Sequence, residues 1–194
     1  MFIGKLYRFQ DIHKSNLLTA CSSYRDLVLS APTGSGKTVL TCSFIDDYLD
    51  ENPNTVFVWL CPGAGGLEKQ SEASFGENMT GIDYGDVYAF INESNPSGKV
   101  YFINWDKINR NSNVVLREGE RRNLMERVYD CHQNDIEIFM IIDEEHKYQE
   151  TAERMITDMN HGHILRISAT PLNAGDYKET YVSECIIDTL TSVR

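Results

Sequence analysis

The sequence predicts an α/β fold in which a mostly parallel β-sheet carries helices on both faces. Short apolar segments typical of buried strands alternate along the chain with segments whose apolar residues recur at helical spacing. Strands separated by helices pair in parallel through crossover connections, and such sheets are covered on both faces. The length of 194 residues suits one domain with its own core. We therefore expect a single domain over residues 1–194.

The first part of the chain predicts a strand, a helix and a second strand. Residues 26–31 (DLVLSA) are short and apolar, which is typical of a buried strand. Residues 37–49 place their apolar side chains on one face of a helix, and the Asn-Pro-Asn sequence at 52–54 ends it. Residues 55–60 (TVFVWL) are rich in strong β formers.

The middle of the chain predicts a helix over residues 67–75 and two strand candidates, 87–91 and 100–104. Only the sequence NESNPSGK separates these two candidates. That segment is too short for a crossover helix, which two parallel neighbours need. We therefore expect one of the two candidates to be an edge strand or an extended loop.

The last part of the chain predicts a polar helix over residues 116–131, followed by strands at 136–142 and 164–168. The strand at 136–142 (IEIFMII) is the most apolar strand that the sequence predicts. Residues 172–194 are expected to be a final strand, with 181–187 as its candidate, or a connection toward a second domain.

The charge of the chain disfavours a stand-alone nucleic-acid-binding protein. There are 29 acidic residues against 18 Lys and Arg, a formal net charge of −11. Neutralising phosphates requires basic side chains, so any contact with DNA should use a small face or other parts of a parent protein.

Cysteine usage and hydropathy indicate the compartment. The five cysteines are widely spaced and contain no CxxC pair, which disfavours a disulfide framework or a zinc site and favours a reducing cytoplasm. There is no apolar run of about 18 residues and no signal-peptide pattern, so we expect no membrane partner and a cytoplasmic location.

A phosphate-binding loop follows the first predicted strand. The sequence Ala-Pro-Thr-Gly-Ser-Gly-Lys-Thr at 31–38 lies between a strand and a helix, and glycines there let backbone N–H groups point at phosphate oxygens. Lys37 is expected to reach the β and γ phosphates, and Thr38 to offer its hydroxyl to Mg²⁺. The expected nucleotide-binding residues are Thr33, Gly34, Ser35, Gly36, Lys37 and Thr38.

A second group of polar residues follows the most apolar strand. The sequence Asp-Glu-Glu-His occupies 143–146. We expect Asp143 to hold Mg²⁺ opposite Thr38, and Glu144 to position or deprotonate the attacking water. His146 is expected to connect this site to a neighbouring motif by hydrogen bonding. Lys37, Asp143, Glu144 and His146 are thus the catalytic candidates.

Two further strand ends carry candidate residues. The sequence Ser-Ala-Thr-Pro at 168–171 ends the strand at 164–168, and the hydroxyls of Ser168 and Thr170 are expected to bond His146 or its neighbours. The Gly-rich segment after residues 55–60 exposes N–H groups suited to a nucleic-acid phosphate. The DNA-binding candidates in and after it are Pro62, Gly63, Gly65 and Gln70.

Together these motifs resemble the P-loop NTPase core of superfamily 2 helicases. The loop begins with Ala31 where the usual pattern has glycine, a variant found in that superfamily. DEEH is similar to the DEAD/DEAH box, SATP to the SAT motif, and the 61–71 segment to motif Ia. The resemblance implies a RecA-like domain that binds ATP with Mg²⁺. It also implies that a glutamine upstream of the loop, here Gln10, recognises adenine.

Within that superfamily the chain resembles the ATPase subunit of type III restriction enzymes. The sequence FINWDKI at 102–108 and the 55–71 segment carry this resemblance, which extends from about Gln10 to Pro171. It implies translocation on duplex DNA, a second RecA-like domain, a nuclease region and a methyltransferase or specificity subunit as partners. The chain is then a fragment or a shortened product, with low ATP turnover by itself.

Two other functions fit parts of the sequence. A nucleotide-dependent DNA-binding or regulatory module without motor activity would agree with the acidic charge. A small-molecule P-loop kinase is disfavoured, because DEEH and SATP have no role there.

Overall fold

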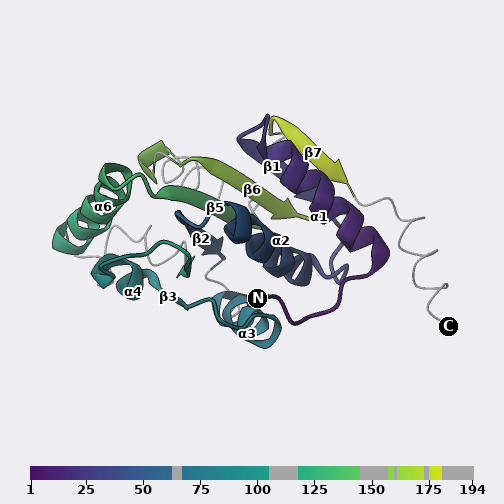
Figure 1. The fold of residues 1–194 in the computed structure, drawn as a ribbon, viewed down its shortest axis with the longest axis horizontal. Coiled ribbons are helices and arrows are strands. Elements are labelled where there is room, and N and C mark those ends of the chain that lie inside the picture. Colours follow the sequence, from purple (N-terminus) through teal and green to yellow (C-terminus); the bar gives the residue numbers. More distant parts are fainter. Residues whose placement is uncertain (63–66, 105–117, 145–156, 160, 173–174, 181–194) are drawn as a thin grey trace.

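A computed structural model describes residues 1–62, 67–104, 118–144, 157–159, 161–172 and 175–180. At its centre is a β-sheet of seven strands in the order β3-β4-β2-β5-β6-β1-β7 (Figure 1). Each pair of neighbouring strands runs parallel. The prediction of a mostly parallel α/β sheet is confirmed.

The described elements follow one another in an alternating order. The strands are β1 (Asp26–Ser30), β2 (Thr55–Cys61), β3 (Tyr84–Asp86), β4 (Val100–Asn104), β5 (Glu137–Asp143), β6 (His163–Ser168) and β7 (Tyr177–Thr180). The helices are α1 (Arg8–Cys21), α2 (Lys37–Glu51), α3 (Leu67–Asn78), α4 (Val87–Asn92) and α6 (Glu118–Gln133). The strands predicted at 26–31, 55–60, 100–104, 136–142 and 164–168 are therefore present, with ends shifted by at most one residue.

Alternation along the central strands divides the core into two layers. On β5, Phe139 and Ile141 pack in the cluster that includes side chains of α1, α2 and α3. Ile138, Met140 and Ile142 pack in the cluster that includes α4 and α6. Because both faces are covered, β2 is buried along its whole length and its sequence is apolar without alternation. The predicted helices on both faces are confirmed.

The strand predicted at 87–91 is wrong, because this segment is helix α4. Asp86 ends the edge strand β3 and caps the helix: its carboxylate accepts a hydrogen bond from the backbone N–H of Ala89 at 2.9 Å. Val87 and Phe90, three residues apart, are the buried side chains of the helix. The crossover between β3 and β4 thus begins with the segment expected to be a strand, so the connection after it can be short.

Two further elements lie near the ends of the described chain, an unpredicted helix and a strand within the range 172–194. No element is predicted for residues 8–21, where the structure has α1. The last described strand, β7, pairs with β1 and ends at Thr180, so the strand candidate at 181–187 lies outside the described residues. Glu179 of β7 is connected to α1 by a hydrogen bond with Nδ1 of His13 and by Asn16, whose Nδ2 donates to Oε1 of Glu179 at 3.1 Å.

A buried ion pair aligns β1 with β6. Arg166, only 4% exposed, donates from Nε and Nη2 to the two carboxylate oxygens of Asp26 at 2.8 and 2.9 Å. This bidentate geometry fixes the position of β1 along β6, and Ser30 lies opposite Ser168 at the other end of the pair. None of the described helices is long and apolar enough to cross a lipid bilayer.

A cluster of polar side chains closes the amino-terminal end of β5 and β6. Glu137 accepts hydrogen bonds from Tyr48 and Thr55 and pairs with Nδ1 of His163 at 2.5 Å. The other ring nitrogen of His163, Nε2, lies 3.1 Å from the carbonyl oxygen of Cys21. Both ring nitrogens face groups that accept, so this geometry suits a doubly protonated imidazolium.

The same cluster shifts the protonation of both partners. The hydrogen bond to Glu137 raises the pKa of His163, against the opposing effect of burial. Burial by itself would raise the pKa of Glu137, but the hydrogen bonds from His163, Thr55 and Tyr48 together hold that pKa below its usual value. The two groups are therefore both charged over a wider pH range in the folded chain than in the unfolded chain.

We predict that this pair stabilises the fold most between about pH 4.5 and 6.5, the ordinary pKa values of the two groups. The contribution of His163 is complete below about pH 6.5 and is lost as the pH rises through its raised folded pKa. The contribution of Glu137 is complete above about pH 4.5 and is lost as the pH falls through its lowered folded pKa.

Urea unfolding of the His163→Gln variant tests this window. We expect a loss of about 2 kcal/mol at pH 5.5 and a clearly smaller loss at pH 9, after allowance for the partial exposure of the pair. His132→Gln is the matched control, because His132 faces the backbone oxygen of Met159. Equal losses at both pH values for His163→Gln would contradict the prediction.

Candidate nucleotide-binding site

The sheet brings the phosphate loop and the acidic strand end to one edge. In a parallel sheet all carboxyl ends lie at the same edge, and ligands bind beyond them. Ser30, the last residue of β1, pairs with Ser168, and Asp143, the last residue of β5, pairs with Ile167. Only β6 separates β1 from β5. Two strand spacings place the backbones of Ser30 and Asp143 about 10 Å apart.

The loop after β1 has a backbone conformation suited to phosphate binding. Gly34 and Gly36 have positive φ angles of 80° and 77°, a left-handed conformation that residues with a Cβ rarely adopt. Gly36 is the N-cap of α2, and its carbonyl accepts the first helical hydrogen bond from Leu40 at 3.0 Å. The first turn of α2 contains no acidic residue. Its free N–H groups and the helix dipole therefore favour an anion at this end.

The ammonium group of Lys37 lies against the loop itself. Its Nζ donates to the carbonyl oxygens of Ala31 at 3.0 Å and Pro32 at 3.2 Å. The next residue, Thr38, is half-buried in the same first turn of α2. A cation and a hydroxyl are thus adjacent at the helix end where the loop N–H groups begin.

Asp143 continues the face of β5 that is turned toward α2. Phe139 and Ile141 of β5 pack in the same cluster as the buried side chains of α2, and Asp143 has the same parity along the strand. The charge of Asp143, after burial as the main cause, raises the pKa of the Cys61 thiol at the end of β2. The alternation along β5 thus assigns Asp143 to the α2 side of the sheet, and the effect on Cys61 shows that the two groups are near each other.

Glu144 is held by the end of β6 in a conformation that is unusual for its residue type. Its φ angle is 53°, and its backbone N–H donates to Ile167 at 2.9 Å. Its carboxylate accepts a hydrogen bond from the hydroxyl of Ser168 at 3.2 Å. A left-handed residue that is not glycine costs free energy and persists only where the surroundings specify it. Here the turn directs Glu144 toward Ser168.

Ser168 connects three parts of the site. Besides bonding Glu144, its hydroxyl accepts from the backbone N–H of Thr170 at 3.1 Å. Its carbonyl accepts from the N–H of Ala31, the first residue of the phosphate loop, at 3.0 Å. The expectation that this residue bonds His146 or a neighbour corresponds to its contact with Glu144. The hydroxyl of Thr170 was expected to bond His146 or its neighbours. The structure describes instead the contact of its backbone N–H with Ser168.

Gln10 packs directly beneath the phosphate loop. It lies in α1, is 3% exposed, and its Nε2 donates to the carbonyl oxygen of Ser35 at 2.9 Å. Its Oε1 accepts from the backbone N–H of Tyr7 at 2.8 Å. Both ends of the amide therefore bond to backbone groups, so the structure gives Gln10 a role in supporting the loop, and adenine recognition stays a prediction.

A shallow cavity of about 400 Å³ adjoins the loop on the side of β7. It is lined by Ser30, Ala31, Pro32, Thr33, Ala169 and Thr180. The first half of the loop is thus reachable from the space between the ends of β6 and β7.

Several candidates lie at the margin of the described residues or beyond it. His146, Gly63 and Gly65 are outside the described residues. Of the DNA-binding candidates, Pro62 is buried at the end of β2 and Gln70 is exposed on α3.

One polar contact between β4 and α3 was missed by sequence reasoning. At the end of β4, Nδ2 of Asn104 donates to Oε2 of Glu68 on α3 at 3.1 Å. A polar residue as the last position of an apolar strand was the available signal for Asn104.

Comparison with known families identifies the chain. The sequence profile of the family described as "Type III restriction enzyme, res subunit" (ResIII) matches residues 5–173. The chain belongs to this family. The match includes the phosphate loop, the acidic end of β5 and the Ser168 segment. No curated protein sequence matches the chain.

Solved structures share the fold of this ResIII domain at low sequence identity. The Sulfolobus solfataricus SWI2/SNF2 ATPase core in complex with dsDNA has a TM-score of 0.62 at 15% identity, over 88% of this chain and 33% of that one. A nuclease-deletion mutant of the Type ISP restriction-modification enzyme LlaGI, in complex with a DNA substrate mimic, has a TM-score of 0.64 at 15% identity, over 95% and 20%. The chain has the RecA-like fold of superfamily 2 motor domains and spans a third or less of these two structures.

We predict that the two loop glycines differ in how strongly they tolerate a side chain. A Cβ at position 36 would lie 2.3 Å from Nε2 of Gln10, whereas a Cβ at position 34 meets no atom within 4 Å. Both substitutions to alanine carry the left-handed strain of about 1 kcal/mol. Gly36→Ala should cost more than Gly34→Ala, because it also displaces the hydrogen bond between Gln10 and Ser35.

A double-mutant cycle isolates this contact. Unfolding free energies of Gly36→Ala, Gln10→Ala and the double variant should show that Gln10→Ala offsets part of the Gly36→Ala loss. The Gly34→Ala and Gln10→Ala pair, which has no such clash, is the control. Additive losses in the Gly36 cycle would contradict the predicted contact.

Proposed function

We propose that this ResIII domain is the ATP-binding, first motor domain of a DNA helicase or translocase, in the restriction subunit of a type III restriction-modification system. The observation that carries the proposal is the convergence of two segments on one edge and one side of the sheet: the loop at residues 34–38 and the carboxylate of Asp143. Such an arrangement suits a triphosphate held between a helix N-terminus and an acidic strand end.

The residues of the loop suit the binding of the phosphates. Backbone N–H groups of the loop and of the first turn of α2 would donate to phosphate oxygens. Lys37 would exchange two neutral carbonyl contacts for charge-assisted bonds to phosphate, which are stronger. The ammonium group is already in the loop, so the exchange requires side-chain rotation only.

The donor set fits Mg²⁺ shared with a nucleotide. The hydroxyl of Thr38 and the carboxylate of Asp143 would hold the ion, which neutralises phosphate charge when bound. Among the described residues no three His, Cys, Asp or Glu side chains gather as a metal cage. Mg²⁺ suits such a sparse set, because it commonly keeps one or two protein ligands beside phosphates and water.

Glu144 is the group best suited to orient the attacking water. Its carboxylate is held by Ser168, and Ser168 is bonded through its carbonyl to the first residue of the phosphate loop. A movement of the loop on nucleotide binding would therefore be transmitted to the carboxylate of Glu144 by Ser168. Ser168 is a positioning residue in this scheme, and Glu144 the general base.

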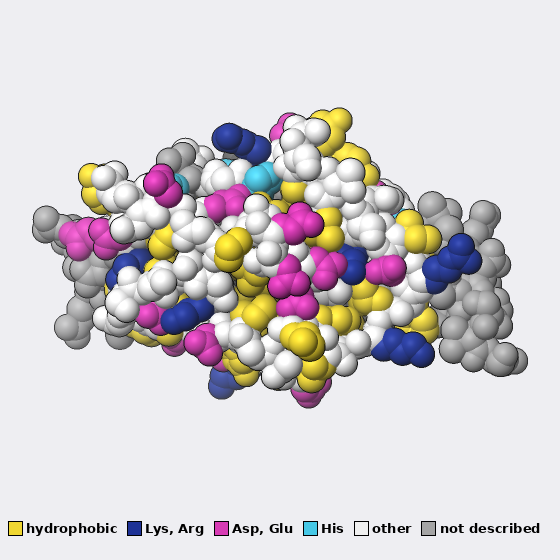
Figure 2. Space-filling view, in the orientation of Figure 1, with side chains coloured by type: hydrophobic (Ala, Val, Ile, Leu, Met, Phe, Trp, Pro, Cys, Tyr) yellow, Lys and Arg dark blue, Asp and Glu magenta, His cyan; other side chains and the backbone are white. Residues whose placement is uncertain are grey.

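The partners of the proposed motor are duplex DNA, a second RecA-like domain, a nuclease region and a methyltransferase or specificity subunit. Figure 2 shows Asp and Glu side chains gathered near the middle of one face of the domain. With a net charge of −11, this domain would contact DNA phosphates only over a limited area, at the loop after β2. The same acidity is the observation that favours the second candidate, a nucleotide-dependent regulatory module without motor activity.

Calorimetry with Mg²⁺ and ADP or ATP tests the nucleotide site. Lys37→Ala should weaken binding about 100-fold or more, equivalent to about 2.7 kcal/mol, because the loop loses its only side-chain cation. Lys5→Ala, an exposed lysine of the amino-terminal segment, is the control and should bind like the wild type. Unchanged affinity in Lys37→Ala would remove the phosphate-loop assignment.

The motor and the regulatory module are distinguished by stimulation. Phosphate release by the chain alone should be slow, and duplex DNA together with a separately produced second motor domain should accelerate it. Nucleotide binding with no acceleration under these conditions would favour the regulatory module.

A substitution at Ser168 tests the proposed positioning role. In the assembled motor, Ser168→Ala should lower the maximal rate of ATP hydrolysis about tenfold and leave nucleotide affinity within about threefold, because Glu144 loses its anchor. Ser43→Ala, a buried serine of α2, controls for general destabilisation. A rate equal to that of the wild type would show that the bond to Glu144 does not matter for hydrolysis.

A further inference from the structure

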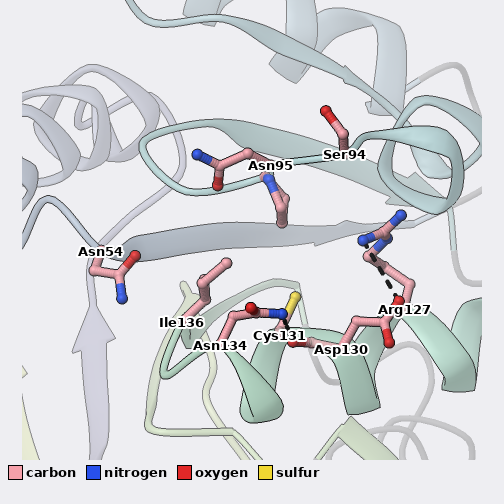
Figure 3. A pocket seen from close by; sticks show the side chains of 9 residues that line it. Asn54, Ser94, Asn95, Arg127, Asp130, Cys131, Asn134 and Ile136 are labelled. Atoms are coloured by element: carbon pink, nitrogen blue, oxygen red, sulfur yellow. Dashed lines mark hydrogen bonds and ion pairs between the residues drawn. The ribbon is translucent and has the colours of Figure 1, made fainter.

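A second cavity lies at the edge of the sheet opposite the phosphate loop. It has a volume of about 320 Å³. Asn54 directly precedes β2, Ile136 directly precedes β5, and the last two turns of α6 and the loop before β4 complete it (Figure 3). Its lining residues are Asn54, Ser94, Asn95, Pro96, Arg127, Asp130, Cys131, Asn134 and Ile136. None of them belongs to the candidate nucleotide site.

Two asparagine amides at this cavity have orientations fixed by the backbone. Nδ2 of Asn54 donates to the carbonyl oxygen of Asp135 at 2.7 Å, and Nδ2 of Asn134 donates to that of Asp130 at 2.7 Å. A carbonyl oxygen only accepts, so the nitrogen of each amide must face it. Each amide therefore keeps its Oδ1 available as an acceptor at the cavity. The amide of Asn95 differs from these two, because its Oδ1 already accepts a hydrogen bond from the backbone N–H of Ser97.

The charges around the cavity also favour a ligand that donates hydrogen bonds. The carboxylate of Asp130 is 55% exposed, and the carboxyl end of α6 adds the negative end of a helix dipole. Arg127 is the one cation of the lining, but its Nε and Nη2 are directed to the carbonyl of Ile91 and its Nη1 lies 3.7 Å from Asp130. Figure 3 shows Arg127 at the far end of the cavity from Asn54.

The floor of the cavity is apolar. Pro96 is buried, Ile136 is 8% exposed and Cys131 is 1% exposed. Burial raises the pKa of the Cys131 thiol to about 11, so this side chain stays neutral and acts as an apolar surface. An alkyl chain would be covered here, while a polar head remained at the acceptors.

We propose that this cavity binds one arginine side chain presented by another polypeptide. The planar guanidinium carries five N–H donors, which match the amide oxygens of Asn54 and Asn134, and the carboxylate of Asp130 adds negative charge to the lining. Its alkyl chain would lie on Pro96 and Ile136. The volume is at the lower end for ligand pockets and suits a single side chain. The net charge of −11 favours approach of a basic partner segment.

The test uses model ligands and the complete 194-residue chain. Nα-acetyl-arginine amide is titrated while the side-chain amide NMR signals of Asn54, Asn95 and Asn134 are followed. We expect saturable shifts of these signals, with at least tenfold weaker binding of the uncharged isostere Nα-acetyl-citrulline amide. Bare guanidinium should also bind more weakly, because it lacks the alkyl chain. Equal affinity of citrulline or of bare guanidinium, or no saturable shift, would overturn the proposal.

Variants at Asn134 decide which charge the cavity prefers. Asn134→Ala should weaken binding of the arginine ligand at least fivefold, and Asn134→Asp should strengthen it. Asn92→Ala is a matched control, because Asn92 is also an exposed asparagine whose Nδ2 donates to the carbonyl four residues earlier, that of Tyr88 at 2.8 Å. It should bind like the wild type.

Two further ligands give outcomes that contradict the assignment. Binding of Nα-acetyl-glutamate amide in place of the arginine ligand would make Arg127 the recognition group and the ligand an anion. Equal binding of the corresponding lysine amide would refute the choice of a guanidinium. Both measurements are independent of ATP, so they leave the proposed motor function untouched.

Discussion

The carboxyl ends of β1, β5 and β6 meet at one edge of a parallel sheet, and every feature of the candidate nucleotide site depends on this. Residues 34–38 and 143–144 are more than a hundred positions apart in the sequence, and only the strand order brings them together. The order is stabilised by continuous apolar strands covered on both faces, and by the Arg166–Asp26 pair, which keeps β1 in register with β6. A slip of one residue in β5 would turn Asp143 to the other face of the sheet.

Ser168 gives this edge its internal connections. A buried serine with one hydroxyl and one carbonyl contacts the phosphate loop, the acidic strand end and the following turn. The positive φ angle of Glu144 has a physical reason in this arrangement, because the turn directs its carboxylate to that hydroxyl. Conformational strain thus occurs at the residue whose orientation matters most for hydrolysis in the proposed mechanism.

The two edges of the sheet differ in chemistry. The carboxyl edge combines N–H groups, Lys37 and a helix N-terminus, which suit an anion, with the carboxylates of Asp143 and Glu144. The amino edge holds the charged pair of Glu137 and His163 and the acceptor-rich cavity beside α6, which suits a cation. The parallel arrangement produces this polarity, because every helix that follows a strand begins at the carboxyl edge and ends at the other.

The sequence by itself determined the strands β1, β2, β4, β5 and β6, and the order of the glycine-rich loop relative to the acidic box. Their signals are local: an apolar run such as IEIFMII, or glycines placed between a strand and a helix. Tertiary structure alone decided three other things. The segment at 87–91 is a helix because Val87 and Phe90 pack in the core layer shared with α6. Gln10 supports the loop because α1 passes beneath it. The Glu137–His163 pair and the cavity at Asn54 and Asn134 arise where residues distant in sequence meet, and no local pattern encodes such meetings.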